Sequence, residues 1–239
     1  MGLDGKRVVI LGGTSGIGFA VAQAAAGEGA QVVVASRNSE RLDRALAGLP
    51  EGSEGRVTNL LNNGEIEALF EHLGEFDHLV YTAGEALRIA PLRAMDISVA
   101  RGFFELRYWG ALTAAKAALG KLRPGGSIVF TSGVAGARPG NGWSVASSIC
   151  SAMEGLTRAL AVELAPIRVN IVSPGVVRTA LWREMDEAAR DALYASAAAR
   201  LPVGHVAEAS EIAQRYLYLM RQTYVTGQVL ALDGGGVLV

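Results

Sequence analysis

A short apolar stretch at residues 7–11 runs directly into the sequence Gly-Gly-Thr-Ser-Gly-Ile-Gly, and an alanine-rich segment follows. Gly12, Gly16 and Gly18 allow a tight turn, and they let the backbone approach a bound group without a Cβ clash. A helix that starts here presents unpaired N–H groups and the positive end of its dipole, which suit a pyrophosphate. The order of strand, glycines and helix predicts a dinucleotide site, and an ordinary glycine-rich turn is the alternative.

Short β-branched stretches alternate with longer helical stretches through the rest of the 239 residues. The strands are expected at 7–11, 31–35, 56–59, 78–82, 127–131, 168–172 and 228–232. The helices are expected at about 17–28, 39–47, 64–73, 96–120, 144–165, 181–199 and 208–221. Near-continuous apolar strands separated by helices indicate a parallel sheet that is covered on both faces. The pattern predicts a single-domain α/β Rossmann fold over residues 1–239, with a doubly wound, seven-stranded parallel sheet and helices on both faces.

Charge and composition exclude several classes of protein. The formal net charge is −1, so the clustered cations that bind nucleic acid are not expected. One cysteine and three widely separated histidines argue against a disulfide framework and against a metal site. Residues 8–27 carry no charge, but they include five glycines, and irregular backbone of that kind does not face lipid. Without an export signal in the N-terminal residues, we expect a cytoplasmic protein with no membrane segment.

Four motifs in order resemble the short-chain dehydrogenase/reductase family over nearly the whole chain. They are Gly-x-x-x-Gly-x-Gly at 12–18, Tyr-Thr-Ala-Gly at 81–84, Pro-Gly-Val-Val-Arg-Thr at 174–179, and the segment from Val225 to Gly235. The resemblance implies that Thr179 contacts the nicotinamide carboxamide and that the chain forms a homotetramer or homodimer. The cofactor-binding residues that we expect are Gly12, Thr14, Ser15, Gly16, Ile17, Gly18, Ser36, Arg37, Asn59, Leu60, Ala83, Gly84, Pro174, Gly175, Val177 and Thr179.

The end of the second expected strand indicates which nicotinamide cofactor is preferred. A carboxylate at this point accepts hydrogen bonds from the ribose of NAD and repels a 2′-phosphate. Here the chain has Ser36 and Arg37 and no acid, so a hydroxyl and a guanidinium are available for the phosphate. Asn59 stands where the family contacts the adenine amino group. We therefore predict NADP(H), with a solvated Arg37 as the alternative.

The family's catalytic residues are replaced at the matching positions. The resemblance implies a tyrosine that donates the proton, a lysine four residues later, a serine before them and an asparagine on the preceding helix. The register places Ala146, Cys150, Gly133 and Arg107 at these four positions. No Tyr-x-x-x-Lys sequence occurs anywhere in the chain, because the only lysines are Lys6, Lys116 and Lys121.

If catalysis persists, another group has to stabilise the alkoxide that hydride transfer creates. Ser132 adjoins the serine position, and a one-residue shift or bulge would present its hydroxyl; a hydroxyl bonded within the strand end or to the cofactor is the alternative. Arg107 would carry positive charge into the pocket, with a surface or interface ion pair as the alternative. Trp143 is expected either in a pocket wall or in the core, and Tyr108 in the core or a subunit contact.

The segment at about 181–205 is expected to cover a partly apolar small-molecule substrate, and packing of its apolar residues is the alternative. We predict an NADP(H)-dependent oxidoreductase of the short-chain type with a non-standard active site. The first alternative is a catalytically silent NADP(H)-binding sensor or regulatory protein on the same fold. The second is a lyase or isomerase that uses the nucleotide only structurally, since the fold alone does not separate these functions.

Overall fold

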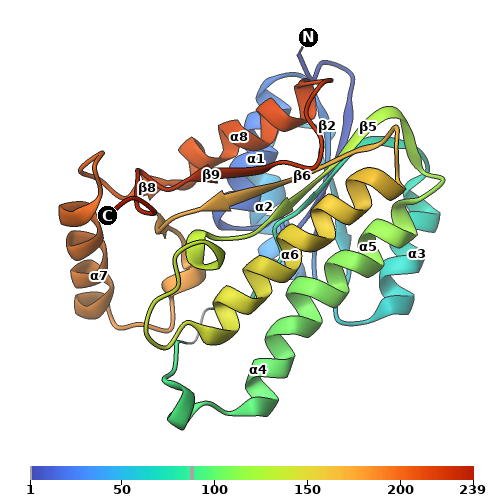
Figure 1. Ribbon diagram of the computed structural model, residues 1–239. Coiled ribbons are helices and arrows are strands. Elements are labelled where there is room, and N and C mark those ends of the chain that lie inside the picture. The colour runs from blue at the N-terminus through green and yellow to red at the C-terminus, as the bar shows by residue number, and fades with distance from the viewer. Residues whose placement is uncertain (1, 87–88) are drawn as a thin grey trace.

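The computed structural model describes residues 2–86 and 89–239, and a parallel sheet lies at its centre (Figure 1). The strand order is β3-β2-β1-β4-β5-β6-β9, and every neighbouring pair is parallel. The strands are β1 (Arg7–Leu11), β2 (Gln31–Ser36), β3 (Glu54–Val57), β4 (Phe76–Tyr81), β5 (Leu122–Thr131), β6 (Arg168–Pro174) and β9 (Val229–Leu232). The predicted seven-stranded parallel sheet is confirmed.

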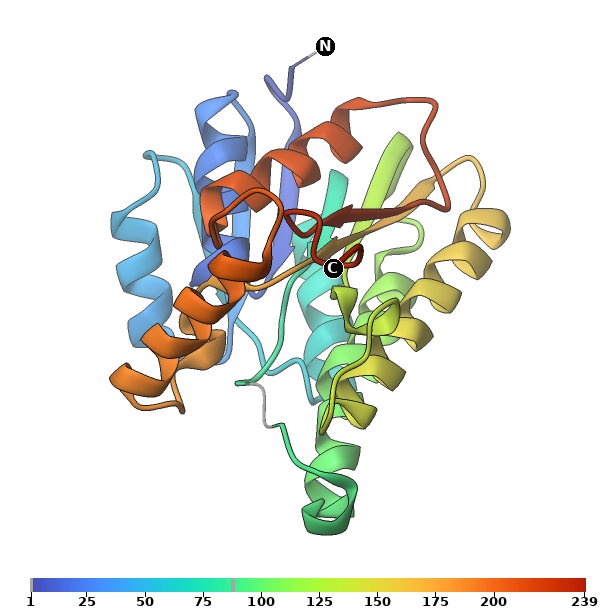
Figure 2. The same cartoon turned by 60° about the vertical axis from the view of Figure 1, so that its left-hand side comes forward.

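Helices cover both faces of this sheet (Figures 1 and 2). One layer contains α1 (Gly16–Gly27), α2 (Ser39–Ala47) and α8 (Ala209–Arg221). The other contains α3 (Asn63–Leu73), α5 (Gly110–Ala118) and α6 (Ser144–Glu163). Side chains alternate along a strand, so Val8 and Ile10 of β1 pack in the first layer, whereas Val9 and Leu11 pack in the second. The two-sided burial explains why the strands are almost continuously apolar.

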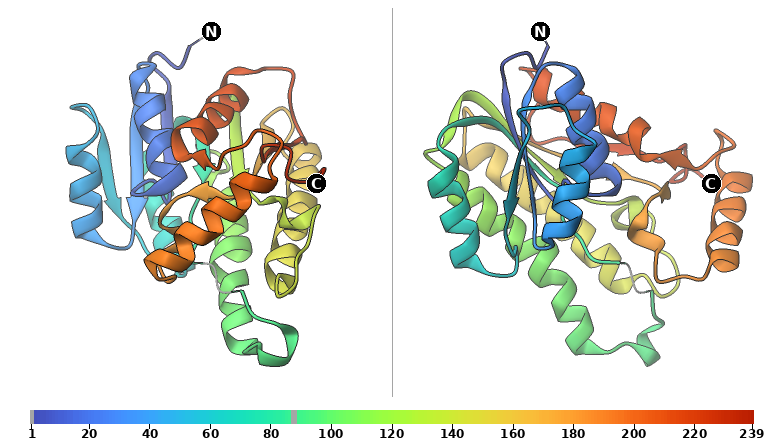
Figure 3. Two further views of the ribbon diagram at one scale, coloured as in Figure 1. Left: turned by 90° about the vertical axis from the view of Figure 1, so that its left-hand side faces the viewer. Right: turned by 180° about the vertical axis from the view of Figure 1, so that it is seen from behind.

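The long helix expected at 96–120 is interrupted. It consists of α4 (Ile97–Phe104), a π-helical turn at Glu105–Trp109, and α5. The buried hydroxyl of Tyr81 donates a hydrogen bond to the Leu106 carbonyl oxygen at 2.5 Å, inside that turn. A single π turn within an α-helix often marks a functional position. Helix α4 projects beyond the end of the sheet (Figures 1 and 3).

The helix expected to start at residue 181 starts at Glu187 instead. Residues Ala180–Trp182 form a 3₁₀ turn, and α7 (Glu187–Arg200) begins after Asp186, whose carboxylate accepts a hydrogen bond from Ala189 N at 2.7 Å. This N-cap sets the boundary that the apolar pattern at 181–185 obscured. Two short parallel strands that the sequence did not indicate, β7 (Val177–Arg178) and β8 (Ala207–Glu208), bracket the segment. Strand β3 also starts two residues earlier than expected.

A polar cluster lies near the amino-terminal ends of the strands, away from the glycine loop. Buried His78 on β4 is hydrogen-bonded through Nδ1 to the Ser127 hydroxyl at 2.9 Å. Next to it, Asp77 accepts hydrogen bonds from Lys6 Nζ and Arg7 N, each at 2.9 Å. Arg168 donates to the Leu219 carbonyl oxygen at 2.6 Å. The cluster joins β1, β4, β5, β6 and the end of α8.

An ion pair also connects two segments that are far apart in the sequence. Arg221, the last residue of α8, lies 2.6 Å from the Glu28 carboxylate just after α1, and 193 residues separate the two. Among the described residues, no helix is long and apolar enough to cross a membrane. The same residues contain no cluster of three or more His, Cys, Asp or Glu side chains that would hold a metal ion.

Candidate active site

The glycine-rich segment where β1 leads into α1 has no room for side chains at several positions. Gly12 has φ +90°, and a Cβ there would lie 2.6 Å from the backbone nitrogen of Ala83. A Cβ on Gly18 would lie 2.3 Å from both the Gly12 carbonyl oxygen and the Thr82 hydroxyl. Thr82 and Ala83 directly follow β4, so the loop packs against the end of the neighbouring strand. The close approach keeps the start of α1 open toward a bound anion.

Motifs that are far apart in the sequence meet at this edge of the sheet. A Cβ on Gly16 would lie 3.3 Å from the Thr179 side chain, although the two residues come from opposite halves of the chain. Gly175 donates its N–H to Leu232 O at 2.8 Å, and a Cβ on it would approach Asp233 to 2.9 Å. Parallel strands place their carboxyl ends at one edge, where ligands bind in open α/β sheets. The segment at 174–179 therefore lies beside the glycine loop.

The residues expected to select the cofactor follow β2 and β3. Ser36 is the last residue of β2, and its hydroxyl accepts a hydrogen bond from Asn38 N at 3.3 Å. Arg37 is exposed, so its guanidinium is available to a ligand. Asn59 Oδ1 accepts a hydrogen bond from Leu61 N at 3.2 Å, and a carbonyl oxygen has a second lone pair for an adenine amino group. Together with the glycine cradle, these residues fit a dinucleotide that carries a 2′-phosphate.

Gly133, Ala146 and Cys150, which were expected at the family's serine, tyrosine and lysine positions, lie near the end of β5 and on α6. Gly133 follows β5, and a Cβ on it would lie 3.4 Å from the Cys150 sulfur on α6. Ala146 is one helical turn before Cys150. Burial raises the pKa of the Cys150 thiol, although the Ser132 hydroxyl and Arg107 act in the opposite direction. The thiol is therefore neutral at physiological pH and supplies no fixed charge.

Ser132 faces α6 in this structure. Its hydroxyl donates to the Cys150 carbonyl oxygen at 3.3 Å and lies 3.5 Å from Glu154 Oε1. The sequence analysis considered a catalytic hydroxyl or one bonded within the strand end or to the cofactor, and it did not foresee this contact with α6. Trp143 is half-buried and packs against the apolar cluster of Trp182, Tyr194, Ala197 and Val206. Trp182 is itself part of that core, where its indole N–H donates to Val177 O at 3.1 Å.

Arg107 lies in the π-helical turn and reaches back to the end of β4. Three atoms of its guanidinium lie 2.8 Å from the point where a Cβ on Gly84 would stand, so the group covers this glycine. Its Nη2 donates to the Glu85 carbonyl oxygen at 2.6 Å, and its Nε lies 3.4 Å from Glu85 Oε2. The structure thus brings together Arg107 and Gly84, which were predicted on separate grounds. A fixed cation beside the cofactor motif can polarise a carbonyl oxygen.

Sequence reasoning missed Glu85 and the contact of Tyr81. Glu85 directly follows the Tyr-Thr-Ala-Gly motif, which was the one available signal for a role near the site. Burial raises the pKa of the Glu85 carboxyl, whereas Arg107 and then Arg37 lower it. Tyr81 opens that motif, and its hydroxyl reaches the turn that carries Arg107.

The doubly wound sheet and the glycine cradle at its switch point define a dinucleotide-binding α/β protein. Residues 12–236 match a family model described as enoyl-(acyl carrier protein) reductase. The short-chain dehydrogenase/reductase malC of Malbranchea aurantiaca is 32% identical over 253 residues, which cover 99% of this chain and 96% of that protein. The chain belongs to the short-chain dehydrogenase/reductase family.

Two solved structures agree with this assignment. A small-chain dehydrogenase solved in complex with NADPH is 37% identical, with a TM-score of 0.88 over 99% of this chain and 100% of the other. The MalC reductase/Diels-Alderase from Malbranchea aurantiaca is 31% identical, with a TM-score of 0.92 over 99% of this chain and 98% of the other. Both likenesses extend over the whole sheet and its helices.

Proposed function

We propose that this protein is an NADP(H)-dependent oxidoreductase that acts on a carbonyl or alcohol substrate through a non-standard active site. The observation that carries the proposal is the Arg107 guanidinium, which lies over Gly84 beside the glycine loop. The cofactor supplies the hydride. A relative of similar sequence was solved with NADPH, which supports the choice of cofactor. The residues of this chain then have to bind the phosphate, orient the substrate and stabilise developing negative charge.

Arg37→Ala is expected to weaken NADPH binding by about 10- to 150-fold, the equivalent of one charged hydrogen-bonding interaction of ~1.5–3 kcal/mol. The reason is that Arg37 is the exposed cation after β2, where a 2′-phosphate would lie. NADH lacks that phosphate, so its affinity should be nearly unchanged. Isothermal titration with both cofactors measures the effect.

Arg44→Ala is the matched control for this titration. Arg44 is an exposed arginine on the following helix α2, and its Nε donates to the Glu40 carbonyl oxygen at 3.3 Å. Its loss should leave both affinities unchanged. Equal losses of NADPH and NADH affinity in Arg37→Ala would refute the assignment of Arg37 to the phosphate.

For the chemical step we propose that Arg107 stabilises the oxygen as negative charge develops on it. Hydride addition to a carbonyl carbon moves the carbon–oxygen π electrons onto oxygen, and the resulting alkoxide takes a proton from water or from the substrate's own acidic group. Ala146 has no proton to give, and the Cys150 thiol is neutral and weakly acidic. Ser132 stays in the proposal as a second donor, with its hydroxyl turned from Cys150 O toward the substrate.

A panel of carbonyl compounds with NADPH tests this step in the wild type, Arg107→Ala and Ser132→Ala. We expect reduction by the wild type to be slow on simple ketones, and Arg107→Ala to lower kcat by about 10²–10³-fold on the best substrate, as loss of an oxyanion-stabilising donor does. Ser132→Ala should have the smaller effect. Rapid reduction of simple ketones that is unchanged in both variants would place the active site elsewhere.

The alternative function is a catalytically silent NADP(H)-binding sensor or regulator. Gly133 and Ala146 favour it, because neither offers a polar side chain where the family's catalytic serine and tyrosine are expected. Tight NADPH binding without turnover of any compound in the panel would establish this alternative.

We also propose that residues 181–205 cover a partly apolar substrate. Leu181 and Met185 are half-buried and pack with Trp143 on the cluster around Trp182. The start of this segment is thus held by the apolar cluster around Trp182, and the paired strands β7 and β8 flank the segment on both sides.

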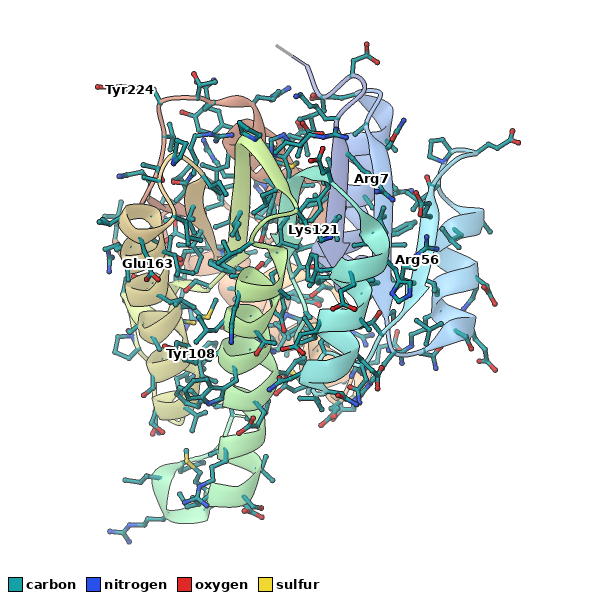
Figure 4. The ribbon with its side chains drawn as sticks, turned by 90° about the vertical axis from the view of Figure 1, so that its right-hand side faces the viewer. Arg7, Arg56, Tyr108, Lys121, Glu163 and Tyr224 are labelled. Atoms are coloured by element: carbon teal, nitrogen blue, oxygen red, sulfur yellow. The ribbon has the colours of Figure 1, made fainter. Side chains whose placement is uncertain are left out.

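A homodimer or homotetramer is proposed on the evidence of an apolar depression on the outer helical layer. Its volume is about 530 Å³, and it lies between the turn that carries Arg107 and helix α6 (Figure 4). The lining residues are Phe104, Tyr108, Trp109, Ala152, Gly155, Leu156 and Ala159. Trp109 is half exposed, and Tyr108 meets it edge to face at 5.0 Å. Aromatic side chains in an apolar depression are typical of a subunit contact.

A further inference from the structure

We propose that Glu85 is a positioning residue that holds the Arg107 guanidinium flat against Gly84. The inference deepens the proposed function and rests on it, since it explains how a flexible side chain becomes a fixed cation at the site. Arginine loses considerable rotamer freedom when it is held in one geometry. Without this restraint, the Arg107 guanidinium would not stay in one position from which it could polarise the substrate oxygen.

Glu85 holds Arg107 at two points. The backbone carbonyl oxygen of Glu85 accepts a hydrogen bond from Nη2 at 2.6 Å, and the carboxylate Oε2 lies 3.4 Å from Nε. The two contacts involve two different nitrogens of the planar guanidinium, so together they restrict its orientation as well as its place. The Cα of Gly84 closes the third side, because no side chain there competes for the space.

Burial makes this pairing specific. The Glu85 side chain is 29% exposed and that of Arg107 is 24% exposed. Glu85 Oε2 and Arg107 Nε are shielded from solvent, and neither has a hydrogen-bond partner among the described residues. A shielded charge is costly unless an opposite charge compensates it. Each of these two atoms therefore depends on the other across the 3.4 Å that separates them.

The charge of Glu85 matters as well as its shape. Burial raises the pKa of its carboxyl, and the two arginines Arg107 and Arg37 oppose that change. A glutamine at this position would keep the size of the side chain and the backbone contact but would lose the electrostatic attraction. Aspartate would keep the charge on a shorter stem. Comparison of Glu85→Gln with Glu85→Asp therefore distinguishes the effect of the negative charge from the effect of side-chain size.

The reactivity of individual arginines toward phenylglyoxal measures the position of Arg107 directly, without cofactor or substrate. After timed exposure, peptide mass spectrometry gives a modification rate for each arginine. We expect Arg107 to react about fivefold faster in Glu85→Gln, the effect of losing a partly buried ion pair of modest strength. Glu85→Asp should restore part of the protection. Equal Arg107 rates in the wild type and Glu85→Gln would overturn the proposal.

Glu28→Gln is the matched control. Glu28 and Arg221 form an ion pair at 2.6 Å with similar exposure, 26% and 33%, and Glu28 Oε2 is likewise shielded without a hydrogen-bond partner among the described residues. In this variant the Arg221 rate should rise and the Arg107 rate should stay at the wild-type value. A general loosening of the fold would instead raise both rates, and the same double rise in Glu85→Gln would count against a local role.

Kinetics then separate this inference from the proposed function. With the best carbonyl compound of the panel, Glu85→Gln should lower kcat, leave the KM for NADPH unchanged, and be partly rescued by Glu85→Asp. If Arg107 becomes more reactive while kcat is unchanged, Glu85 does hold Arg107, and it is the catalytic role of Arg107 that is wrong.

Discussion

Gly18→Ala is expected to destabilise the fold by about 3 kcal/mol, at the upper end of the usual cost of overpacking. The added Cβ would stand 2.3 Å from the Gly12 carbonyl oxygen and from the Thr82 hydroxyl. One of these contacts is backbone, so the loop itself has to move. The same movement opens the cradle, and NADPH affinity should fall at least about tenfold. Urea unfolding and isothermal titration measure the two effects.

Gly27→Ala is the control, because it makes the same change in the same helix. A Cβ on Gly27 meets nothing within 4 Å, and the residue is exposed at the end of α1. Alanine in a helix is favoured over glycine by roughly 0.5–1 kcal/mol, so this variant should be neutral or slightly more stable. Its NADPH affinity should equal that of the wild type. If Gly18→Ala has the same stability and NADPH affinity as Gly27→Ala, the described packing of the glycine loop against the end of β4 is wrong.

Acid is expected to destabilise the protein by about 3 kcal/mol through His78 alone. Burial, assisted by the charge of Arg168, lowers the pKa of this histidine from 6.5 to about 4 in the folded state. The folded protein therefore binds the proton less readily than the unfolded chain does. The stabilisation is fully present above about pH 6.5 and is lost as the pH falls toward about 4.

The comparison of the wild type with His78→Gln isolates this contribution. Urea unfolding at several values between about pH 7.5 and pH 4 gives the free energy of unfolding of each protein. His78→Gln is less stable at neutral pH because the Ser127 contact changes, but its stability should fall less on acidification. The hydrogen bonds to Asp77 act on its carboxylate in both proteins, so their pH dependence largely cancels. Parallel pH profiles for the two proteins would contradict the assignment.

The order and type of the sheet elements were predictable because two-sided burial leaves a clear apolar signal. Strand β1 has the predicted bounds of residues 7–11, and α2 has those of 39–47. The π turn within the expected helix at 96–120 was not predictable, since no proline or glycine pair marks it. The turn is accompanied by a tertiary contact, the Tyr81 hydroxyl on the Leu106 carbonyl oxygen. Side-chain contacts of this kind produce no periodic pattern of residues in the sequence.

In the candidate site, too, some features could be predicted from the residue type, whereas others depend on tertiary contacts. Gly12 and Gly18 were predictable because the backbone itself requires them, and that requirement shows in the residue type. Arg107 was predictable only as the occupant of a family position, and its contact with Glu85 joins residues 22 apart, one after β4 and one in the π-helical turn. For Ser132 the sequence left the direction of the hydroxyl open, and in the structure it points to the Cys150 carbonyl oxygen on α6. The sequence could name these residues, but the direction in which their side chains point could be learned only from the structure.

The Arg221–Glu28 pair has a consequence for how the chain is made. The glycine loop is synthesised well before α8, which covers the apolar side of α1. Thr179, which lies against Gly16, is also synthesised late. A nascent chain therefore carries the most conspicuous nucleotide-binding motif long before it has a nucleotide site. Free NADP(H) cannot assist the early stages of folding, and it stabilises only the chain in which α8 is in place.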